Sequence, residues 1–316
     1  SHSLAREVHM LRRLVPATAV ATLLIAGLTG CGAQQSQASD CLAPMSSGAL
    51  SNNVTVLGEF GTAPEVSVPK DIEISETQRT IVSEAEDRSR VAEEGSLVSV
   101  NMAFFDAASG DQLYASPVFS GQGTSPEFLL VAKDTANPLS EGVRCAAAGD
   151  RVVLALAPDD GAEIAAQLGG TEDSAVVAVL DVGTTSPLAA NGAVQGLPSG
   201  YPAVVTNDEG RPGIVLPPRE APEGISSASR IVGDGAKVTA ENNVVGQVLS
   251  VGWDGEQRTN TWESGLVALG TEEQIAQSGF TFRGELTGKT VGSQVVIIDN
   301  STGDPQVVVV DILGVS

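Results

Sequence analysis

Residues able to do acid–base or metal chemistry are scarce in this sequence. The two histidines, His2 and His9, lie ahead of an apolar run that is typical of a secretion signal. A processed chain would keep neither, which excludes Ser-His-Asp and Cys-His catalysis and histidine-ligated metals. Acidic turns remain at 159–163 and 299–304, and neither has the spacing of a calcium-binding loop. We therefore expect solvated turns, with no metal and no cofactor.

The composition narrows the class of protein. Lys and Arg number 17 against 39 Asp and Glu, a net charge of −22. Because binding to phosphates needs a basic surface, nucleic acid is not an expected partner. Gly233-Asp234-Gly235 is typical of a hairpin turn and not of a phosphate loop, since no lysine-bearing helix follows it. With 3% aromatic residues and 35 glycines, the chain reads as a turn-rich β protein, and its 316 residues favour two domains.

The N-terminal segment predicts export and lipidation. A basic pair and the apolar run 14–28 follow Met10, and the run ends at Leu28-Thr29-Gly30-Cys31. This pattern resembles a bacterial lipoprotein signal, so 1–30 is the predicted signal peptide and Cys31 the lipidated residue. Residues 1–9 precede the better start at Met10 and represent an earlier start or a tag. Acyl chains on Cys31 would hold the protein at the outer face of the cytoplasmic membrane.

Two cysteines remain once Cys31 is lipidated. In an oxidising compartment, an even pair such as Cys41 and Cys145 predicts a disulfide. The alternative is two unrelated buried thiols.

One pattern occurs twice along the chain. Ala63-Pro64-Glu65-Val66-Ser67-Val68-Pro69 returns as Arg211-Pro212-Gly213-Ile214-Val215-Leu216-Pro217, and each copy closes with an apolar strand that carries an aspartate, Asp181 or Asp311. A repeat of this length indicates a duplicated domain, because solenoid repeats are shorter. We predict a lipidated tether, a first domain, a linker and a second domain at 31–53, 54–185, 186–203 and 204–316.

Within each copy, the elements predict an α+β fold. Short β-branched runs alternate with Gly, Asn and Asp turns, which favours antiparallel sheet. One short helix per copy is predicted, at 134–143 and 271–278, the second opened by the acids of Thr271-Glu272-Glu273-Gln274. A helix laid on one face of a sheet buries the apolar surface of both.

The second copy carries motifs that resemble a known family. These are Val232-Gly233-Asp234-Gly235, Trp253-Asp254-Gly255, Trp262-Glu263-Ser264-Gly265 and the closing run 307–313. Together they resemble the FKBP-type peptidyl-prolyl isomerases that actinobacteria secrete as lipoproteins, often with two tandem domains. The resemblance covers nearly all of 54–316, more clearly in the second copy. It implies two tandem FKBP-like domains, each an antiparallel half-barrel sheet with one short helix.

The resemblance also implies a chemistry that needs no histidine. The family binds proline-containing polypeptides in an apolar pocket walled by aromatic rings. Rotation about an X-Pro amide meets a resonance barrier of about 18–20 kcal/mol, and a dry pocket favours the twisted amide, in which the charge separation of resonance is lost. No general acid, nucleophile or cofactor is required.

The family's pocket residues are replaced in both copies. In the second copy, Val248-Leu249-Ser250 replaces Tyr-Thr-Gly, Arg258-Thr259 replaces Phe-Asp, Val310 replaces a phenylalanine, and Phe282 is the one ring left near the helix. In the first copy, the corresponding positions fall on Leu113-Tyr114, near Leu139, and on Ala162 in the loop that usually supplies a tyrosine. The resemblance thus implies that the chain has the family's fold but has lost most of the residues that line the family's pocket.

Three functions remain open at this point. The first is weak or residual prolyl isomerisation, or prolyl-peptide binding, that assists folding outside the cell. The second is an inactive peptide-binding or scaffold module that recognises extended chains on an edge strand. The third is a structural or solute-handling lipoprotein. The candidates to line any remaining pocket are Phe282, Trp262, Val310, Tyr114, Phe128 and Leu139.

Overall fold

The computed structural model describes residues 41–132 and 137–316. The predicted signal peptide, Cys31 and the first part of the predicted helix 134–143 lie outside the described residues. Residues 43–316 group into one unit, which holds both sheets described below. No helix in the described part of the chain combines the length and the apolar character needed to cross a bilayer.

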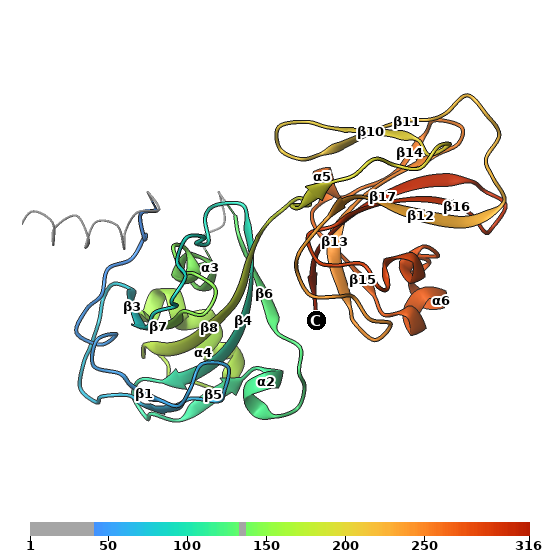
Figure 1. The fold of residues 1–316 in the computed structure, drawn as a ribbon. Coiled ribbons are helices and arrows are strands. Elements are labelled where there is room, and N and C mark those ends of the chain that lie inside the picture. Colours follow the sequence, from blue (N-terminus) through green and yellow to red (C-terminus); the bar gives the residue numbers. More distant parts are fainter. Residues whose placement is uncertain (1–40, 133–136) are drawn as a thin grey trace, which may run out of the picture. The chain divides into compact units, whose positions relative to one another are not determined.

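The first sheet is antiparallel and has the strand order β3-β7-β8-β4-β5, with β6 also beside β4 (Figure 1). β5 and β6 pair with different stretches of β4, the first with its C-terminal part and the second with its N-terminal part. The strands are β3 (Gln78–Ser83), β4 (Ser96–Asp106), β5 (Gln112–Ala115), β6 (Glu127–Val131), β7 (Arg151–Leu156) and β8 (Val176–Pro187).

The second sheet is also antiparallel and repeats this connectivity. Its order is β12-β16-β17-β13-β14, with β15 beside β13 and the short β9 added outside β12. The strands are β9 (Ala193–Val194), β12 (Gly224–Val232), β13 (Val244–Gly252), β14 (Gln257–Asn260), β15 (Val267–Gly270), β16 (Gln294–Asn300) and β17 (Gln306–Val315).

The two sheets also share their register. The pairing of β4 with β8 shifts between Ser99 and Val100, and that of β13 with β17 shifts between Val245 and Gly246. Beyond the shift, Met102 lies opposite Leu180 in the first sheet, as Val248 lies opposite Val310 in the second. Both halves of the chain therefore place corresponding residues on corresponding faces, because strand side chains alternate between faces.

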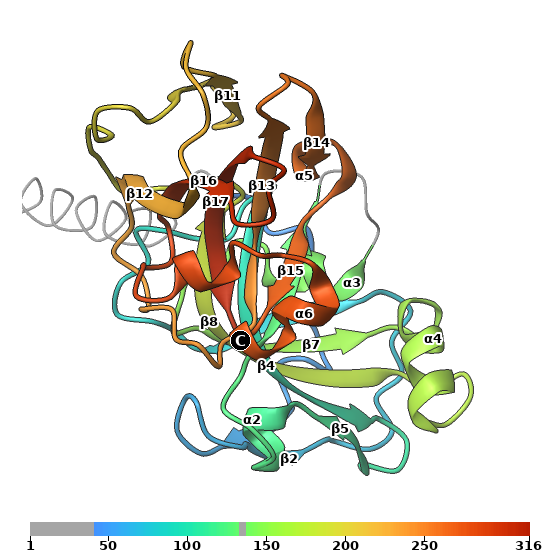
Figure 2. The same cartoon turned by 90° about the vertical axis from the view of Figure 1, so that its right-hand side faces the viewer.

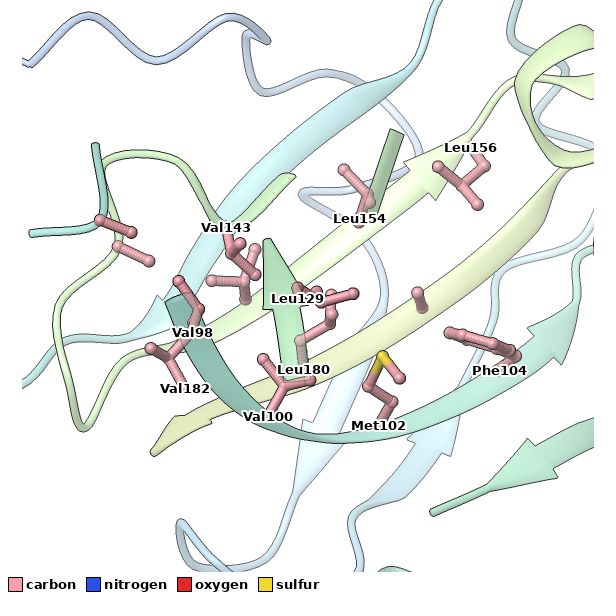
Figure 3. Packing of buried hydrophobic residues seen from close by; sticks show 14 of the residues in the cluster. Val98, Val100, Met102, Phe104, Leu129, Val143, Leu154, Leu156, Leu180 and Val182 are labelled. Atoms are coloured by element: carbon pink, nitrogen blue, oxygen red, sulfur yellow. The ribbon is translucent and has the colours of Figure 1, made fainter. Parts of the chain in front are cut away.

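Each sheet is covered on both faces. Leu139 and Val143 of α3 (Pro138–Val143) pack on one face of the first sheet, which we call the α3 face; Figure 3 shows its apolar cluster. The hairpin of β1 (Thr55–Leu57) and β2 (Glu65–Ser67) packs on the other face.

The second sheet is covered in the same way. The hairpin of β10 (Ala203–Thr206) and β11 (Pro212–Val215) covers one face. On the other face, which we call the η2 face, lies the segment that runs through α6 (Ile275–Ser278) into η2 (Arg283–Leu286) (Figures 1 and 2). The second strand of each hairpin, β2 or β11, comes from one of the two repeated segments that the sequence shows at 63–69 and 211–217.

Both predicted helices are confirmed in their described parts. Asn137 caps α3 by accepting hydrogen bonds from the backbone N–H groups of Leu139 and Ser140. In the second half, Thr271 and Gln274 form a capping box that opens η1 (Glu272–Gln274), and α6 follows directly. Short helices without long apolar faces depend on such caps. Two further single-turn helices, α2 (Pro117–Ser120) and α5 (Thr261–Ser264), follow β5 and β14.

Two segments differ from the sequence-based expectation. The stretch around Ala162, expected as a loop, is the helix α4 (Pro158–Leu168), because Pro158 starts it and Asp159 and Asp160 suit its N-terminal dipole. The end of the expected tether is packed rather than free, since Leu50 and Ser51 are completely buried. An apolar side chain at position 50 fills the hairpin side of the first sheet, so this part of the chain belongs to the fold.

A buried ion pair joins the first sheet to its hairpin. The Nε and one Nη of Arg151 on β7 donate to the two carboxylate oxygens of Asp181 on β8, at 2.5 and 2.8 Å. The same guanidinium donates to the carbonyl oxygens of Gly58, Glu59 and Thr62 in the hairpin turn. Such a bidentate pair, in which all three guanidinium nitrogens donate, repays the cost of leaving water better than an isolated charge would.

The corresponding pair in the second sheet lacks the arginine. Gln294 occupies the position of Arg151, and its Nε2 donates to Asp311 Oδ1 at 2.9 Å. The other oxygen of Asp311 accepts from the backbone N–H of Ala190 at 2.8 Å. Burial raises the pKa of Asp311 to about 6, and the hydrogen bonds from Ala190 and Gln294 and the charge of Arg230 only partly oppose this.

We expect Arg151→Ala to lower the free energy of unfolding by about 3–5 kcal/mol, because the Asp181 carboxylate would stay buried without its cation. Arg151→Gln, which copies the arrangement of the second sheet, should cost clearly less, since glutamine can still donate to Asp181. Urea unfolding of the three proteins measures both effects. Equal losses for the two variants would show that the hydrogen bond to Asp181 contributes nothing.

The Asp311 carboxyl should make stability depend on pH. Its folded pKa of about 6 lies above the reference value of 3.8, so its contribution is most favourable below pH 4 and is lost as pH rises through 6, by up to about 3 kcal/mol. Asp311→Asn should remove this part of the pH dependence, whatever constant change in stability it brings. Unfolding free energies at pH 4.5 and 7.5 test this, with the exposed Asp208→Asn as control. An unchanged slope in Asp311→Asn would contradict the assignment.

Candidate functional site

The candidate site begins with two aromatic rings in contact on the α3 face of the first sheet. Phe104 on β4 lies opposite Tyr114 on β5, and their ring centroids are 5.4 Å apart at an interplanar angle of 32°. Phe104 is buried and Tyr114 is half-buried. The pair therefore presents an aromatic surface that is partly accessible from solvent.

A carboxylate lies against the tyrosine. The Tyr114 hydroxyl donates to Glu127 Oε1 at 2.5 Å. The contact forms because β5 and β6 both pair with β4, which brings Tyr114 and Glu127 together across the gap between them. The second oxygen, Glu127 Oε2, is buried and has no hydrogen-bond partner among the described residues. A buried acceptor of this kind favours a ligand that supplies a donor.

The tyrosine is held protonated. Burial, the hydrogen bond to Glu127 and the charge of Glu127 raise the pKa of Tyr114 to about 12. At neutral pH the hydroxyl is therefore a donor and not a base. The Tyr114 hydroxyl therefore offers binding and orientation rather than proton abstraction.

Apolar residues complete the surroundings of these rings. Tyr114 and Leu139 pack against the cluster that contains Phe104, Met102 and Leu180. Ser116 closes the gap between β5 and β6: its N–H donates to the Met102 carbonyl at 2.8 Å, and its Oγ accepts from the Met102 N–H at 3.1 Å. Thr261 Oγ1 accepts from the Val248 N–H in the same way in the second half, at 2.7 Å.

Phe128 lies apart from this group. On β6, Leu129 and Val131 are buried in the apolar cluster, and Glu127 faces the same side. Because strand residues alternate, Phe128 points to the opposite face. Of the three candidates in the first half, Tyr114 and Leu139 therefore share one cluster and Phe128 does not.

The η2 face of the second sheet is filled by its own side chains. Phe282 and Val310 lie in one cluster with Val248, and Phe282 is only 5% exposed. The ring of Phe280 contacts that of Phe282 in a tilted arrangement, with centroids 5.7 Å apart and an interplanar angle of 54°. Trp262 is half-buried on α5 and is not part of this cluster. Of the three candidates in the second half, Phe282 and Val310 thus lie in one apolar cluster, and Trp262 lies outside it.

A buried arginine next to Phe282 was not anticipated from the sequence. Arg283 is completely buried, and its guanidinium donates to the carbonyl oxygens of Gly270, Thr239 and Asn242 at 2.7–2.9 Å. Burial lowers the pKa of Arg283, and the charge of Glu272 opposes this. The arginine clamps two loops onto η2 and so closes this end of the η2 face.

Arg258, which the resemblance places at a pocket position, is on the surface. Its two Nη atoms each donate to a carboxylate oxygen of Asp304 at 2.7 Å. The hydrogen bond to Asp304 raises the pKa of Arg258, and burial opposes this. Asp304, one of the turn acids, is thus in an ion pair. Within 41–132 and 137–316, no cluster of three or more His, Cys, Asp or Glu has a metal-binding arrangement.

Trp253 and the two cysteines are held within the fold by packing, a hydrogen bond and disulfide bonding. Trp253 packs on the hairpin side of the second sheet, and its indole N–H donates to the Arg219 carbonyl at 2.8 Å. Cys41 and Cys145 are both disulfide-bonded, a state that an oxidising compartment permits.

Comparison with known proteins gives matches among solved structures only. No family model and no curated protein matches the chain. The chain is similar to the three FKBP domains of wheat FKBP73, with 13% identity and a TM-score of 0.30, over 76% of this chain and 94% of that one. It is also similar to the N-terminal domain of FKBP42 from Arabidopsis thaliana (12%, TM-score 0.30, 39% and 95%) and to a peptidyl-prolyl cis-trans isomerase from Pseudomonas syringae (14%, TM-score 0.27, 34% and 74%).

Titration of the tyrosine tests the geometry of the site. In a Tyr201→Phe background, Tyr114 is the one tyrosine left, and its ultraviolet absorbance should titrate near pH 12. Glu127→Gln should lower this pKa, since it removes the negative charge that opposes ionisation. The exposed Glu76→Gln is the control. An unchanged midpoint in Glu127→Gln would mean that the carboxylate does not contact the hydroxyl.

Proposed function

We propose that the chain is a cell-surface lipoprotein with tandem FKBP-like domains, whose first domain binds proline-containing polypeptides and catalyses X-Pro isomerisation weakly. The observation that carries the proposal is the contact of the half-buried Tyr114 ring with the buried Phe104 ring, with the unpartnered Glu127 Oε2 beside them. The shared connectivity and register of the two sheets support a duplicated domain.

The chemistry of this site suits a prolyl amide. Rings and aliphatic side chains give a surface poor in water, on which the twisted amide loses less solvation than the planar one. Glu127 Oε2 would accept an N–H donor of the bound peptide. Isomerisation of a prolyl amide breaks no covalent bond, so it needs neither a general acid nor a general base. Assistance to protein folding outside the cell is the role that such an activity would serve.

The second domain favours the non-catalytic alternative for its own half. Its η2 face is occupied by Phe282, and the loops at its end are held by the buried Arg283. We propose that this half acts as a peptide-binding or scaffold module rather than as an isomerase. Anchoring through Cys31, after removal of 1–30, would place both halves outside the cytoplasmic membrane.

A protease-coupled isomerisation assay on the full chain tests the proposal. We expect a rate above the uncatalysed one with a prolyl tetrapeptide substrate. Tyr114→Ala should reduce this catalysis at least about fivefold, because an aromatic contact contributes about 1 kcal/mol. Phe128→Ala, which removes a ring on the other face of β6, is the matched control and should leave the rate unchanged.

The variant Phe282→Ala separates the two halves. It should destabilise the chain by about 3–5 kcal/mol, since it opens a cavity in the core, without lowering the rate per folded molecule. A background rate for the wild type would refute the enzymatic proposal and leave the non-catalytic alternative. Loss of the rate in a folded Phe282→Ala protein would move the active site to the second half.

A further inference from the structure

One edge of the second sheet is largely open. β12 pairs along its length with β16 on one side. On its other side, β9 pairs only with Ile231 and Val232, and the Gln195 N–H donates to the Arg230 carbonyl at 2.7 Å. Among the described residues, no strand pairs with 224–229 on that side. Gly224, Ile225 and Ser226 are exposed to solvent.

This edge lacks the features that usually block strand addition. The stretch 224–229 reads Gly-Ile-Ser-Ser-Ala-Ser and contains no proline and no charged residue. The shift in its pairing with β16 falls after Ser229, beyond the open stretch. Edge strands normally carry a lysine, a proline or a bulge, because an open edge pairs with other chains. The absence of all three along these residues leaves a regular edge that can accept another strand.

The corresponding edge of the first sheet is already covered. There, the Arg79 N–H on β3 donates to the Ser46 carbonyl at 3.0 Å. The side chain of Gln78 accepts from the N–H groups of Leu50 and Ser51, at 2.9 and 3.2 Å. The chain itself thus covers the first residues of β3, in the part of the edge that stays open in the second sheet.

We propose that the β12 edge binds an extended polypeptide segment with a basic residue, added antiparallel to β12 and in line with β9. β9 begins this added strand and stops after two residues, so a bound segment would continue an existing pairing. Backbone hydrogen bonds would provide affinity, as in other cases of strand addition.

A neighbouring glutamate selects the charge of the partner. Glu285 Oε2 accepts from the Ser227 hydroxyl at 2.5 Å, which fixes the carboxylate beside the open edge. A residue opposite Ser227 on an added strand would have its Cβ about 5 Å from that of Ser227. A lysine or arginine there would face Glu285. Two copies of this chain would instead bring two such glutamates together, and each copy carries a net charge of −22.

The test uses the full chain and a labelled heptapeptide, Val-Thr-Val-Lys-Val-Thr-Val, blocked at both ends. We expect saturable binding, and protection from hydrogen exchange of outward-facing amides within 224–229. A peptide with Glu in place of Lys should bind at least fivefold more weakly. Glu285→Gln should abolish that preference, whereas the exposed Glu273→Gln should keep it.

Two proline variants keep the test independent of folding. The N–H groups of neighbouring strand residues point to opposite sides of the strand. Of the variants Ser226→Pro and Ser227→Pro, one therefore removes an N–H that points to the open edge. The other removes an N–H that pairs with β16. One variant should stay as stable as the wild type by thermal melting and lose peptide binding.

Three outcomes would overturn the proposal: binding that both proline variants retain, equal affinity for the two peptides, or dimerisation through the edge in place of peptide binding. The inference does not depend on the isomerase site. Tyr114→Ala should leave peptide binding at β12 unchanged, so failure of one proposal is distinguishable from failure of the other.

Discussion

A buried aspartate at the same register position of β8 and β17 is the constraint that each half of this protein has to satisfy. In the first half, Arg151 neutralises Asp181 and holds three carbonyl oxygens of the hairpin turn at the same time. This holds the hairpin over one face of the sheet and shields that face from water, while α3 covers the other face. In the second half, Asp311 has the same place but is held by an amide side chain and a backbone N–H. One architecture is thus maintained by two different electrostatic arrangements.

Most of the fold could be predicted from the pattern of residues. Alternating apolar strands, turn residues and the repeated segment predicted antiparallel sheets and two short helices, which the described residues bear out. The pattern did not reveal α4, because Pro158-Asp159-Asp160-Gly161 reads equally as a turn and as a helix start. Nor did it show that Leu50 is buried, since a single apolar residue among small polar ones has no period to detect.

The candidate site was only partly accessible to such reasoning. Tyr114 and Leu139 could be named from the resemblance. For β6, the sequence shows that neighbouring side chains alternate between the two faces of the sheet, but not which set faces the apolar cluster. Only the structure shows that Phe128 points away from it. Glu127 was missed, although its spacing from Leu129 and Val131 would have placed it on the buried side once that phase was known. Arg283 was missed because three of its acceptors are backbone carbonyl oxygens, those of Gly270, Thr239 and Asn242, which carry no signal in residue type.

The segment that covers β3 gives the N-terminal end of the folded part a protective role. Ser46, Leu50 and Ser51 satisfy backbone and side-chain groups along that edge, so a protease that trimmed the chain to residue 54 would uncover it. The molecule would then carry one bare edge on β3 and another on β12, which are different surfaces. Contacts between different surfaces of identical molecules grow into open-ended chains unless their rotation closes a ring. The segment 46–51 beside β3 thereby hides one of the two edges through which molecules would have to pair to form a fibre.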